Sequence, residues 1–379
     1  MKSEKRKTSL YWIAVIFFAV LSVLINLVTF IKSFADFYAD VFYPVLVNFM
    51  GRINDWSAVA FGEILMYIAA LILATEIVCV IIFLFSKKKD NIKKHVIILS
   101  KLVLFLTVLT VFLFTVTWVI PLRSERVDTL HASGKQYTFS DLEKLRNYMV
   151  ERTNSLAEKA ERNEDGRLIF YDDTEARIIN AMKKKSDIYP RLRGFYGRPK
   201  YALCSDILEW SGIGGYTYAY TKETSLNKYT SRFYFISLYS HELCHYKGYF
   251  KENEANFLSY ILMNESDDNL LAYSVNANTY FQYIEPAYNE ALIALYKGDT
   301  NVHIKQQPSM LSIVYKDMND SYNESRDLYN SNAHPAEQFS RAVTEVSDYG
   351  WEAQDAVLQE DNYNGVVRML LEYYDGILK

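Results

Sequence analysis

Residues 240–263 read SHELCHYKGYFKENEANFLSYILM and contain the motif His241-Glu242-Leu243-Cys244-His245. Residues that are four positions apart share one face of a helix, so both imidazoles can bind a single Zn²⁺ ion. The carboxylate of Glu242 would then take a proton from a water molecule that the metal activates. The motif therefore predicts a zinc site at the start of a helix, with Glu242 as its general base.

A catalytic zinc site usually has three protein ligands, so a third must come from elsewhere in the chain. The metzincin pattern would place a histidine at position 251, but the chain has Lys251 there, which cannot bind a metal while it is protonated. The next expected helix offers Glu252 and Glu254, which lie about 200° apart around a helix, so only one of them can face the metal. We expect Glu252 to be the third ligand, with Glu254 as the alternative. Asn256 follows Glu252 on the same helix face, and we expect its amide to orient a ligand histidine.

The segment before the motif is rich in aromatic and β-branched residues. Residues 215–221 (GYTYAYT) and 232–239 (RFYFISLY) predict two strands of a small, largely antiparallel sheet. The strand from Arg232 to Tyr239 would lead directly into the helix of the motif and align an extended peptide beside the metal. The glycines at 212, 214 and 215 predict a turn, because they lack the Lys-Ser or Lys-Thr pair of a phosphate-binding loop.

Helices account for most of the other residues after position 121. An amphipathic helix is expected over 140–162, where Ser140 and Glu143 have the spacing of a capping box, and a second over 173–186. Further helices are expected near 240–247, 252–264, 266–298, 307–330, 335–347 and 363–377. No Pro-rich, Gly/Ser-rich or repeated segment divides residues 122–379, so we expect one domain there.

The N-terminal third of the chain is apolar enough to cross a membrane. No charged residue occurs between Lys7 and Lys32, or between Lys101 and Arg123, and about 20 apolar residues suffice for a transmembrane helix. Three spans are therefore expected, over about 9–31, 62–85 and 97–121. This pattern rules out a wholly soluble protein and divides the chain into a membrane region, 1–121, and a following domain, 122–379.

The distribution of cations predicts the orientation of the spans. The N-terminus and the connection after the second span are rich in lysine and arginine, whereas the 32–61 segment has only Lys32 and Arg52 beside three aspartates. The positive-inside rule places the first two in the cytoplasm and everything after about Leu122 outside it. The formal net charge of the chain is −4, and its acidic excess lies after residue 121, which argues against nucleic acid as a partner.

Three polar features of the chain have no role that the sequence alone defines. Glu76 lies inside the second span, and we expect it to pack neutral, or near water, within the three-helix bundle. Cys79 lies in the same span, so only Cys204 and Cys244 could form a disulfide, and the sequence does not place them within bonding distance. Residues 32–61 are expected to form a loop between the first two spans, and this loop likewise has no predicted role.

Residues 199–260, from PKYALCSDILEWSGIGGYTYAYT to HELCHYKGYFKENEANFLSY, resemble the domain of unknown function 3810 family. The resemblance extends to the three spans and to the C-terminal YNGVVRMLLEYY, and its most specific part is HExxH followed by ExEANFL. Gluzincins have a similar Glu-x-x-x-Asp helix, and by that pattern Glu252 is the ligand and Asn256 its neighbour. The resemblance implies a mainly α protein of the bacterial cell membrane, in which three transmembrane helices precede a zincin-like, gluzincin-type α+β domain.

Together these patterns predict a membrane-anchored zinc metallopeptidase that hydrolyses an extracytoplasmic peptide or protein. His241, His245 and Glu252 would hold Zn²⁺, and Glu242 would act as general base and then as proton donor. An alternative is a catalytically silent zincin that serves as a receptor or scaffold in the envelope, although the intact Glu242 argues against it. The expected partners are the lipid bilayer and a peptide or protein substrate.

Overall fold

The computed structural model describes residues 2–86, 89–124, 127, 135–296, 307–334, 339–341, 343, 344, 347 and 362–378. The chain is mainly helical (72%), with one small sheet among the described residues. Its contacts divide it into two units, Met1–Glu125 with Tyr218–Glu223, and Arg126–Thr217 with Thr224–Lys379. The short segment Tyr218–Glu223 thus belongs to the first unit, although it lies far along the sequence.

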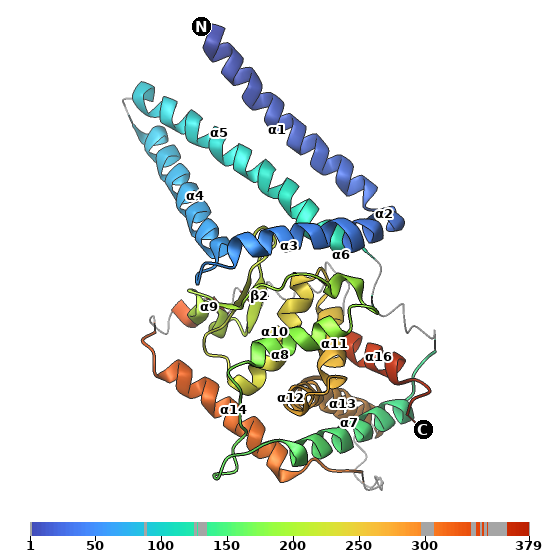
Figure 1. The fold of residues 1–379 in the computed structure, drawn as a ribbon. Coiled ribbons are helices and arrows are strands. Elements are labelled where there is room, and N and C mark those ends of the chain that lie inside the picture. The colour runs from blue at the N-terminus through green and yellow to red at the C-terminus, as the bar shows by residue number, and fades with distance from the viewer. Residues whose placement is uncertain are drawn as a thin grey trace. The chain divides into compact units, whose positions relative to one another are not determined.

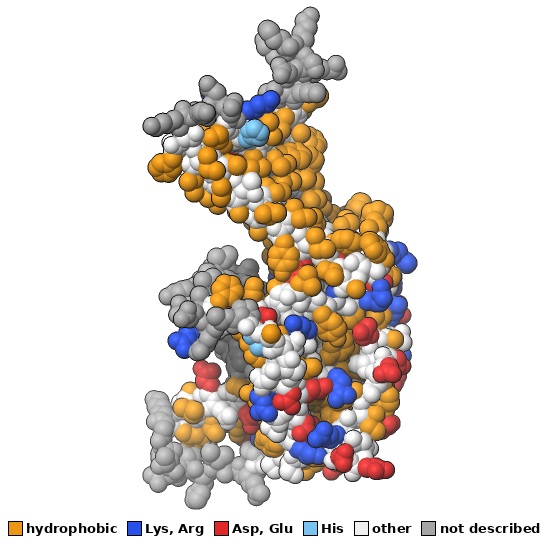
Figure 2. All heavy atoms as spheres, turned by 90° about the vertical axis from the view of Figure 1, so that its left-hand side faces the viewer, with side chains coloured by type: hydrophobic (Ala, Val, Ile, Leu, Met, Phe, Trp, Pro, Cys, Tyr) orange, Lys and Arg blue, Asp and Glu red, His pale blue; other side chains and the backbone are white. Residues whose placement is uncertain are grey.

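The first unit contains three helices that are long and apolar enough to cross a membrane, as the sequence predicts. These stretches are Leu10–Val28, Phe61–Phe85 and Ile92–Leu122. The elements of this unit are α1 (Lys2–Val28), α2 (Lys32–Phe37), the π-helix η1 (Tyr38–Phe42), α3 (Tyr43–Asn54), α4 (Phe61–Phe85), α5 (Lys89–Phe114), the π-helix η2 (Thr115–Val119) and α6 (Ile120–Leu122). Apolar side chains dominate the visible surface of this unit, whereas charged ones are concentrated on the other (Figure 2).

Polar side chains within these spans pair with one another. Asn26 of α1 donates a hydrogen bond of 2.9 Å to the hydroxyl of Thr115. The hydroxyl of Ser100 in α5 donates to Glu76 of α4, so this carboxylate has a neutral partner inside the unit. Unpaired polar groups in hydrocarbon are costly, and these pairings reduce that cost.

The segment Tyr218–Glu223 is bound within the first unit by several hydrogen bonds. The amide of Asn54 donates to the carbonyl of Thr221 over 2.6 Å, and the ammonium of Lys222 donates to the carbonyl of Thr117 over 2.9 Å. The carboxylate of Glu223 accepts from the backbone N–H groups of Phe61 and Gly62, at 3.0 and 2.9 Å. An anion is favourable at a helix N-terminus, so Glu223 supplies a cap for α4 from a distant part of the chain.

The second unit is built around three helices that pack against one another, α10 (Arg232–Tyr246), α11 (Glu252–Asn264) and α12 (Asn269–Thr279). Helix α7 (Phe139–Lys159) packs against α12, and α16 (Asn362–Tyr374) packs against α11 (Figure 1). The other elements are α8 (Thr174–Lys184), the 3₁₀ helix η4 (Pro190–Leu192), α9 (Ser205–Trp210), the π-helix η5 (Tyr280–Ile284), α13 (Glu285–Tyr296) and α14 (Ser312–Asn330). Tyrosines form much of the core, because the side chains of Tyr229, Tyr239, Tyr246, Tyr260, Tyr273 and Tyr280 are almost fully buried.

The sheet is mixed, so the expectation of an antiparallel sheet is wrong for one of its two pairings. Its strands are β1 (Lys200–Tyr201), β2 (Gly215–Thr217) and β3 (Thr224–Leu226), in the order β1-β3-β2. β2 and β3 are antiparallel, whereas β1 and β3 are parallel. The strand expected over 215–221 ends at Thr217, because Tyr218 begins the segment that belongs to the first unit.

The strand expected from Arg232 to Tyr239 is also wrong, because these residues form the first half of α10. The hydroxyl of Ser231 accepts a hydrogen bond from the backbone N–H of Tyr234 and caps the helix. Most side chains of α10 are buried, so large aromatic and β-branched residues stabilise it by packing even though they also favour strands. Tertiary packing therefore decides the local structure here.

The other expected helices agree with the structure in type but differ in their bounds. The capping box of α7 uses Thr138 and Asp141, two residues before the expected pair Ser140 and Glu143. The expected helix over 266–298 is divided into α12, η5 and α13. The expected helix over 335–347 falls largely outside the described residues.

Candidate metal centre

Helix α10 carries the HExxH motif in its last two turns and ends soon after it. The helix ends at Tyr246, and Gly248 has a φ of 93°, which favours glycine and lets the chain turn sharply. Helix α11 then begins at Glu252, so its first turn comes back to the end of α10. The turn between the two helices therefore places Glu252 close to the histidines.

His241, His245 and Glu252 come together in space. Nε2 of His241 lies 3.3 Å from Oε2 of Glu252, and Nε2 of His245 lies 3.3 Å from Oε1 of the same carboxylate. Each side chain offers one ligand atom, and the three atoms all lie within 4.8 Å of one another. These residues form a cluster that could hold a metal ion.

The spacing and the chemistry of this cluster fit a small divalent cation. Bonds of about 2.0–2.2 Å from a tetrahedral zinc ion place its ligand atoms roughly 3.3–3.6 Å apart. Each histidine Nε2 lies 3.3 Å from a different oxygen of Glu252, which agrees with that range, whereas one ligand atom from each residue gives a set within 4.8 Å, which is wider. Two imidazoles and one carboxylate suit zinc and its neighbouring transition metals better than magnesium or calcium, which prefer oxygen ligands.

The outer nitrogens of the two histidines have different surroundings. Nδ1 of His245 donates to the backbone carbonyl of Tyr249 over 2.8 Å, which keeps Nε2 directed at the cluster. Nδ1 of His241 is buried and has no hydrogen-bond partner among the described residues. The carbonyl of Tyr249, rather than the expected amide of Asn256, thus orients His245.

Glu254, the alternative ligand, faces a different partner. Its side chain is buried, and Oε1 lies 3.6 Å from the ammonium of Lys251. The cluster of potential ligands includes Glu252 and not Glu254 among the described residues. The two carboxylates of α11 therefore have separate surroundings, as their angular separation on the helix requires.

Glu242 is buried beside the edge of the sheet. The hydroxyl of Thr217 in β2 lies 3.0 Å from Oε2 of Glu242 and 3.1 Å from its backbone carbonyl, so it can donate to either oxygen. Gly215 allows this approach, since a Cβ atom there would lie 2.9 Å from the carbonyl oxygen of Ser225 and 3.3 Å from Cγ of Glu242. Burial raises the pKa of Glu242, while the two histidines and Thr217 oppose that shift.

The charges of the cluster are strongly coupled in the protein without metal. Burial acts to lower the pKa of His245, but the Glu252 carboxylate outweighs it and raises that pKa to about 9. Burial likewise acts to raise the pKa of Glu252, but the two histidines hold it well below its usual range. His245 and Glu252 therefore form an ion pair at neutral pH, and a divalent cation that binds there displaces the histidine proton.

Two contacts of this site lie outside the sequence predictions. Thr217 touches Glu242 from the neighbouring strand, and the signal for it is Gly215, because a glycine inside a strand often marks a close approach of another element. The carbonyl of Tyr249 has no sequence signal, since every residue has a carbonyl. Cys204 and Cys244 are both free thiols, so no disulfide joins the sheet region to the motif.

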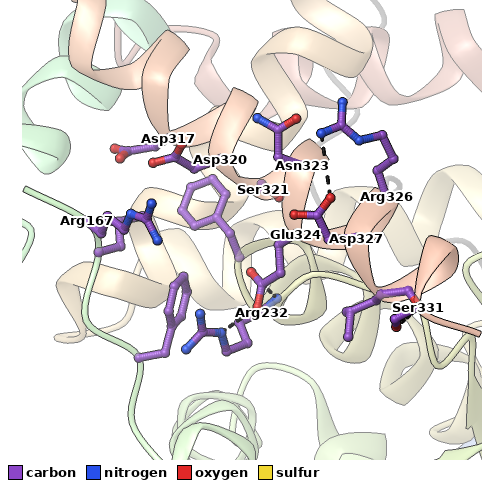
Figure 3. Close-up of a pocket in the computed structure, with 14 residues that line it drawn as sticks. Arg167, Arg232, Asp317, Asp320, Ser321, Asn323, Glu324, Arg326, Asp327 and Ser331 are labelled. Carbon is purple, nitrogen blue, oxygen red and sulfur yellow. Dashed lines mark hydrogen bonds and ion pairs between the residues drawn. The ribbon is translucent and has the colours of Figure 1, made fainter. Parts of the chain in front are cut away.

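A separate hollow of about 660 Å³ lies at the other end of α10 (Figure 3). Arg167 and Arg232 lie on one side of it, and acidic side chains of α14 lie on the other, with Arg232 paired to Glu324 at 2.6 Å. Arg232 precedes His241 by nine residues, which is about 13 Å of helix and half a turn around it. The hollow is therefore distinct from the metal cluster.

The comparisons with known proteins give one match. No curated protein and no solved structure matches this chain. The family described as protein of unknown function (DUF3810) matches residues 38–347, which include α4, α5, the whole sheet, α10 and α11. Because this match covers most of the sequence, the chain belongs to the DUF3810 family of proteins of unknown function.

Proposed function

We propose that this protein is a membrane-anchored, zinc-dependent metallopeptidase that hydrolyses a peptide or protein outside the cytoplasm. The observation that carries the proposal is the meeting of His241, His245 and Glu252 within 4.8 Å, next to the buried carboxylate of Glu242. A structural helix has no need of this arrangement, because it is costly to bury His245 and Glu242 beside two further ionisable groups that are partly exposed.

His241, His245 and Glu252 would hold the zinc ion, which supplies a Lewis acid when it is bound. Glu242 would accept a proton from the attacking water and donate it to the leaving amine. Its burial supports this role, since a raised pKa lets a carboxylate both take and return a proton near neutral pH. Thr217 would hold the carboxylate in place through its hydroxyl.

Strand β2 would align the substrate in place of the segment 232–239, which is helical. β2 pairs with β3 on one side and is an edge strand of the described sheet. An extended peptide can add to such an edge through backbone hydrogen bonds. Thr217 of β2 contacts Glu242, so a peptide paired with this strand would run beside the general base.

The distribution of lysine and arginine gives the proposed location. The cationic N-terminus and the cationic connection between the second and third spans would lie in the cytoplasm. The second unit would lie on the other side of the bacterial cell membrane. The three apolar helices support membrane association by their length and composition.

The test is the metal content of the full chain, purified in detergent after growth with added zinc. Mass spectrometry should find about one zinc ion per chain, because three protein ligands suffice for a catalytic site. Glu252→Ala should lose the metal, whereas Glu254→Ala, the same change two residues along α11, should keep it. Zinc that persists in Glu252→Ala would contradict the ligand set, and a metal-free wild-type chain would overturn the proposal.

The receptor or scaffold alternative predicts a different result for Glu242. A chain that binds zinc but hydrolyses no member of a diverse peptide library, with or without Glu242→Gln, would favour that alternative. Hydrolysis by the wild-type chain that disappears in Glu242→Gln would exclude it.

A further inference from the structure

The segment between the first two spans is a helix that runs without interruption from Lys32 to Asn54 through α2, η1 and α3. At about 1.5 Å per residue its length is roughly 35 Å. Figure 1 shows α3 running across the ends of α4 and α5, at a steep angle to both, within the first unit. If α4 and α5 cross a bilayer, α3 lies close to the plane of its surface.

One face of this helix is packed against its own unit. Ala35, Ala39, Tyr43, Val47 and Gly51, each four residues from the next, are all buried. The ammonium of Lys222 lies 4.9 Å from the centre of the Tyr43 ring, and Asn54 binds Thr221 at the end of the same face. The segment Tyr218–Glu223 therefore occupies the part of this inner face between Tyr43 and Asn54, while α6 packs against α2 and η1.

The opposite face is apolar and exposed. Phe37, Val41, Val45, Phe49 and Ile53 are also spaced by four and are offset by two residues from the buried row, which places them about 200° around the helix. Val45 and Phe49 are 67% and 63% exposed, much like Leu71 in the second span at 68%. Exposed rows of large apolar residues mark a surface that is covered by something other than water.

A polar row separates the two faces along one edge. Asp36, Asp40, Asn48 and Arg52 share that edge, each one residue after a member of the buried row. Trp56, 75% exposed, follows the end of α3, and tryptophan is enriched where protein meets the headgroup layer of a bilayer. A long helix with one apolar face and one polar edge is the form that lies in a membrane interface.

The geometry points to a membrane-surface helix over residues 32–54, whose outer face, Phe37, Val41, Val45, Phe49 and Ile53, inserts into the lipid of the bilayer that the three spans cross. Both ends of the segment lead into candidate membrane spans, α1 before it and α4 after it, so the helix is held at the level where these spans end. The polar row then faces the headgroups and water. This inference does not depend on the metal cluster.

Spin labels on the full chain test the inference directly. The three native cysteines are changed to alanine, and a label is attached at position 45, 48, 49 or 52, one at a time, in vesicles of phosphatidylethanolamine and phosphatidylglycerol. Oxygen, which partitions into lipid, should relax the labels at Val45→Cys and Phe49→Cys more strongly than a water-soluble nickel chelate does. Asn48→Cys and Arg52→Cys should show the reverse order, because they lie on the polar edge.

Two results would overturn the inference. Strong relaxation by the nickel chelate at positions 45 and 49 would mean that the outer face is in water. Weak relaxation by both reagents would mean that protein covers this face, either a second copy or another part of the chain.

A second measurement keeps the native cysteines and so does not depend on folding of the cysteine-free chain. The fluorescence of Trp56 is the difference between the wild-type chain and the Trp56→Phe variant, which retains the other tryptophans. Brominated lipids should quench this difference signal. Quenching by acrylamide in water but not by brominated lipid would contradict the inference.

Discussion

Helices α4 and α10 both carry large apolar side chains on several sides, yet these side chains meet opposite surroundings. α4 exposes Leu71, Ile81 and Phe85, whereas α10 buries Phe233, Ile236 and Leu243. Large apolar side chains occur both in membrane spans and in the centre of a folded core, and α10 also carries Arg232 and the ionisable residues of the motif. The difference lies in the neighbours, because α10 is surrounded by α11, α12 and β2.

Their ionisable groups show the same contrast. α4 carries Glu76, which accepts a hydrogen bond from one serine hydroxyl. α10 carries His241, Glu242 and His245, and each of them interacts with Glu252 or lies next to a residue that does. A core helix can thus assemble ionisable groups from several elements at one point, which a span that faces lipid cannot do.

The largest expected effect is on the rate of the proposed hydrolysis, and it should follow from a substitution in α10 and not from one in a neighbouring helix. We expect Glu242→Gln to lower the rate of peptide hydrolysis by about 10²–10⁴-fold, because the amide cannot accept the proton of the attacking water. Zinc content should remain that of the wild-type chain. The matched control is Glu254→Gln, a buried carboxylate of the neighbouring helix that pairs with Lys251 and should keep full activity. Equal loss in both variants would show that the effect is structural.

The same substitution in the two helices should have very different effects on stability. Ile236→Ala in α10 leaves a cavity in the core and should lower the free energy of unfolding by about 2–5 kcal/mol. Ile81→Ala in α4, where the side chain is 49% exposed, should change it by less than about 1 kcal/mol. Denaturant unfolding of the full chain in detergent, followed by circular dichroism, measures both. Similar losses would mean that α4 is also buried against protein.

Metal binding should depend on pH because of the charge on His245. The Glu252 carboxylate raises the pKa of this histidine to about 9, so a proton must leave before the metal binds at neutral pH. We expect zinc affinity to rise about tenfold per pH unit between roughly pH 7 and 9, with about one proton released per ion. Calorimetry in buffers of different ionisation enthalpy measures both quantities, and an affinity that is constant over this range would contradict the expectation.

The stability of the metal-free protein should fall as the pH rises, whereas the zinc affinity should rise. A pKa that is raised on folding means that the protonated histidine adds stability, fully so below about pH 6.5, its value in the unfolded chain. That contribution is lost as the pH rises through about 9. Thermal unfolding in the presence of a chelator should therefore show a falling midpoint across this range.

The smallest effect is expected for Thr217→Val, which removes the hydroxyl at nearly constant shape. The Thr217 hydroxyl lowers the pKa of Glu242 against the larger effect of burial, so its loss should raise that pKa further. The acidic limb of the pH–rate profile should then move to higher pH, with the zinc content unchanged. Thr224→Val is the control, since Thr224 is buried on β3 and lies 3.5 Å from Thr217. A shift of the same size in both variants would remove any specific role of Thr217.

Local patterns in the sequence predict the features that depend on spacing along one helix. The three spans follow from long apolar stretches with few charged residues, and the meeting of His241, His245 and Glu252 follows from helix periodicity and the short turn at Gly248. The segment 232–239 could not be predicted in the same way, because aromatic and β-branched residues suit a buried helix as well as a strand. Only the elements packed around α10 decide between the two.

Contacts between segments that are distant in the sequence could not be predicted either, because they too depend on the packing of several elements. The parallel pairing of β1 with β3 depends on where a segment enters the sheet. The expectation of a loop over 32–61 is wrong for residues 32–54, which form a helix whose inner face is covered by Tyr218–Glu223 and other residues of its unit. No local signal in either segment specifies its partner.

The loop between β2 and β3 belongs to the first unit, whereas the two strands belong to the second. A chain cut near Arg126 would keep Tyr218–Glu223 but lose every partner of that segment in the first unit, including Asn54, Phe61, Gly62 and Thr117. The ammonium of Lys222 and the carboxylate of Glu223 would then have to find other partners or water, while the loop would stay joined to the paired strands β2 and β3 at its two ends. Deletion of the three apolar helices should thus loosen the loop that follows Thr217, the residue that contacts Glu242, so fragments without these helices are poor substitutes for the whole protein in tests of the proposed function.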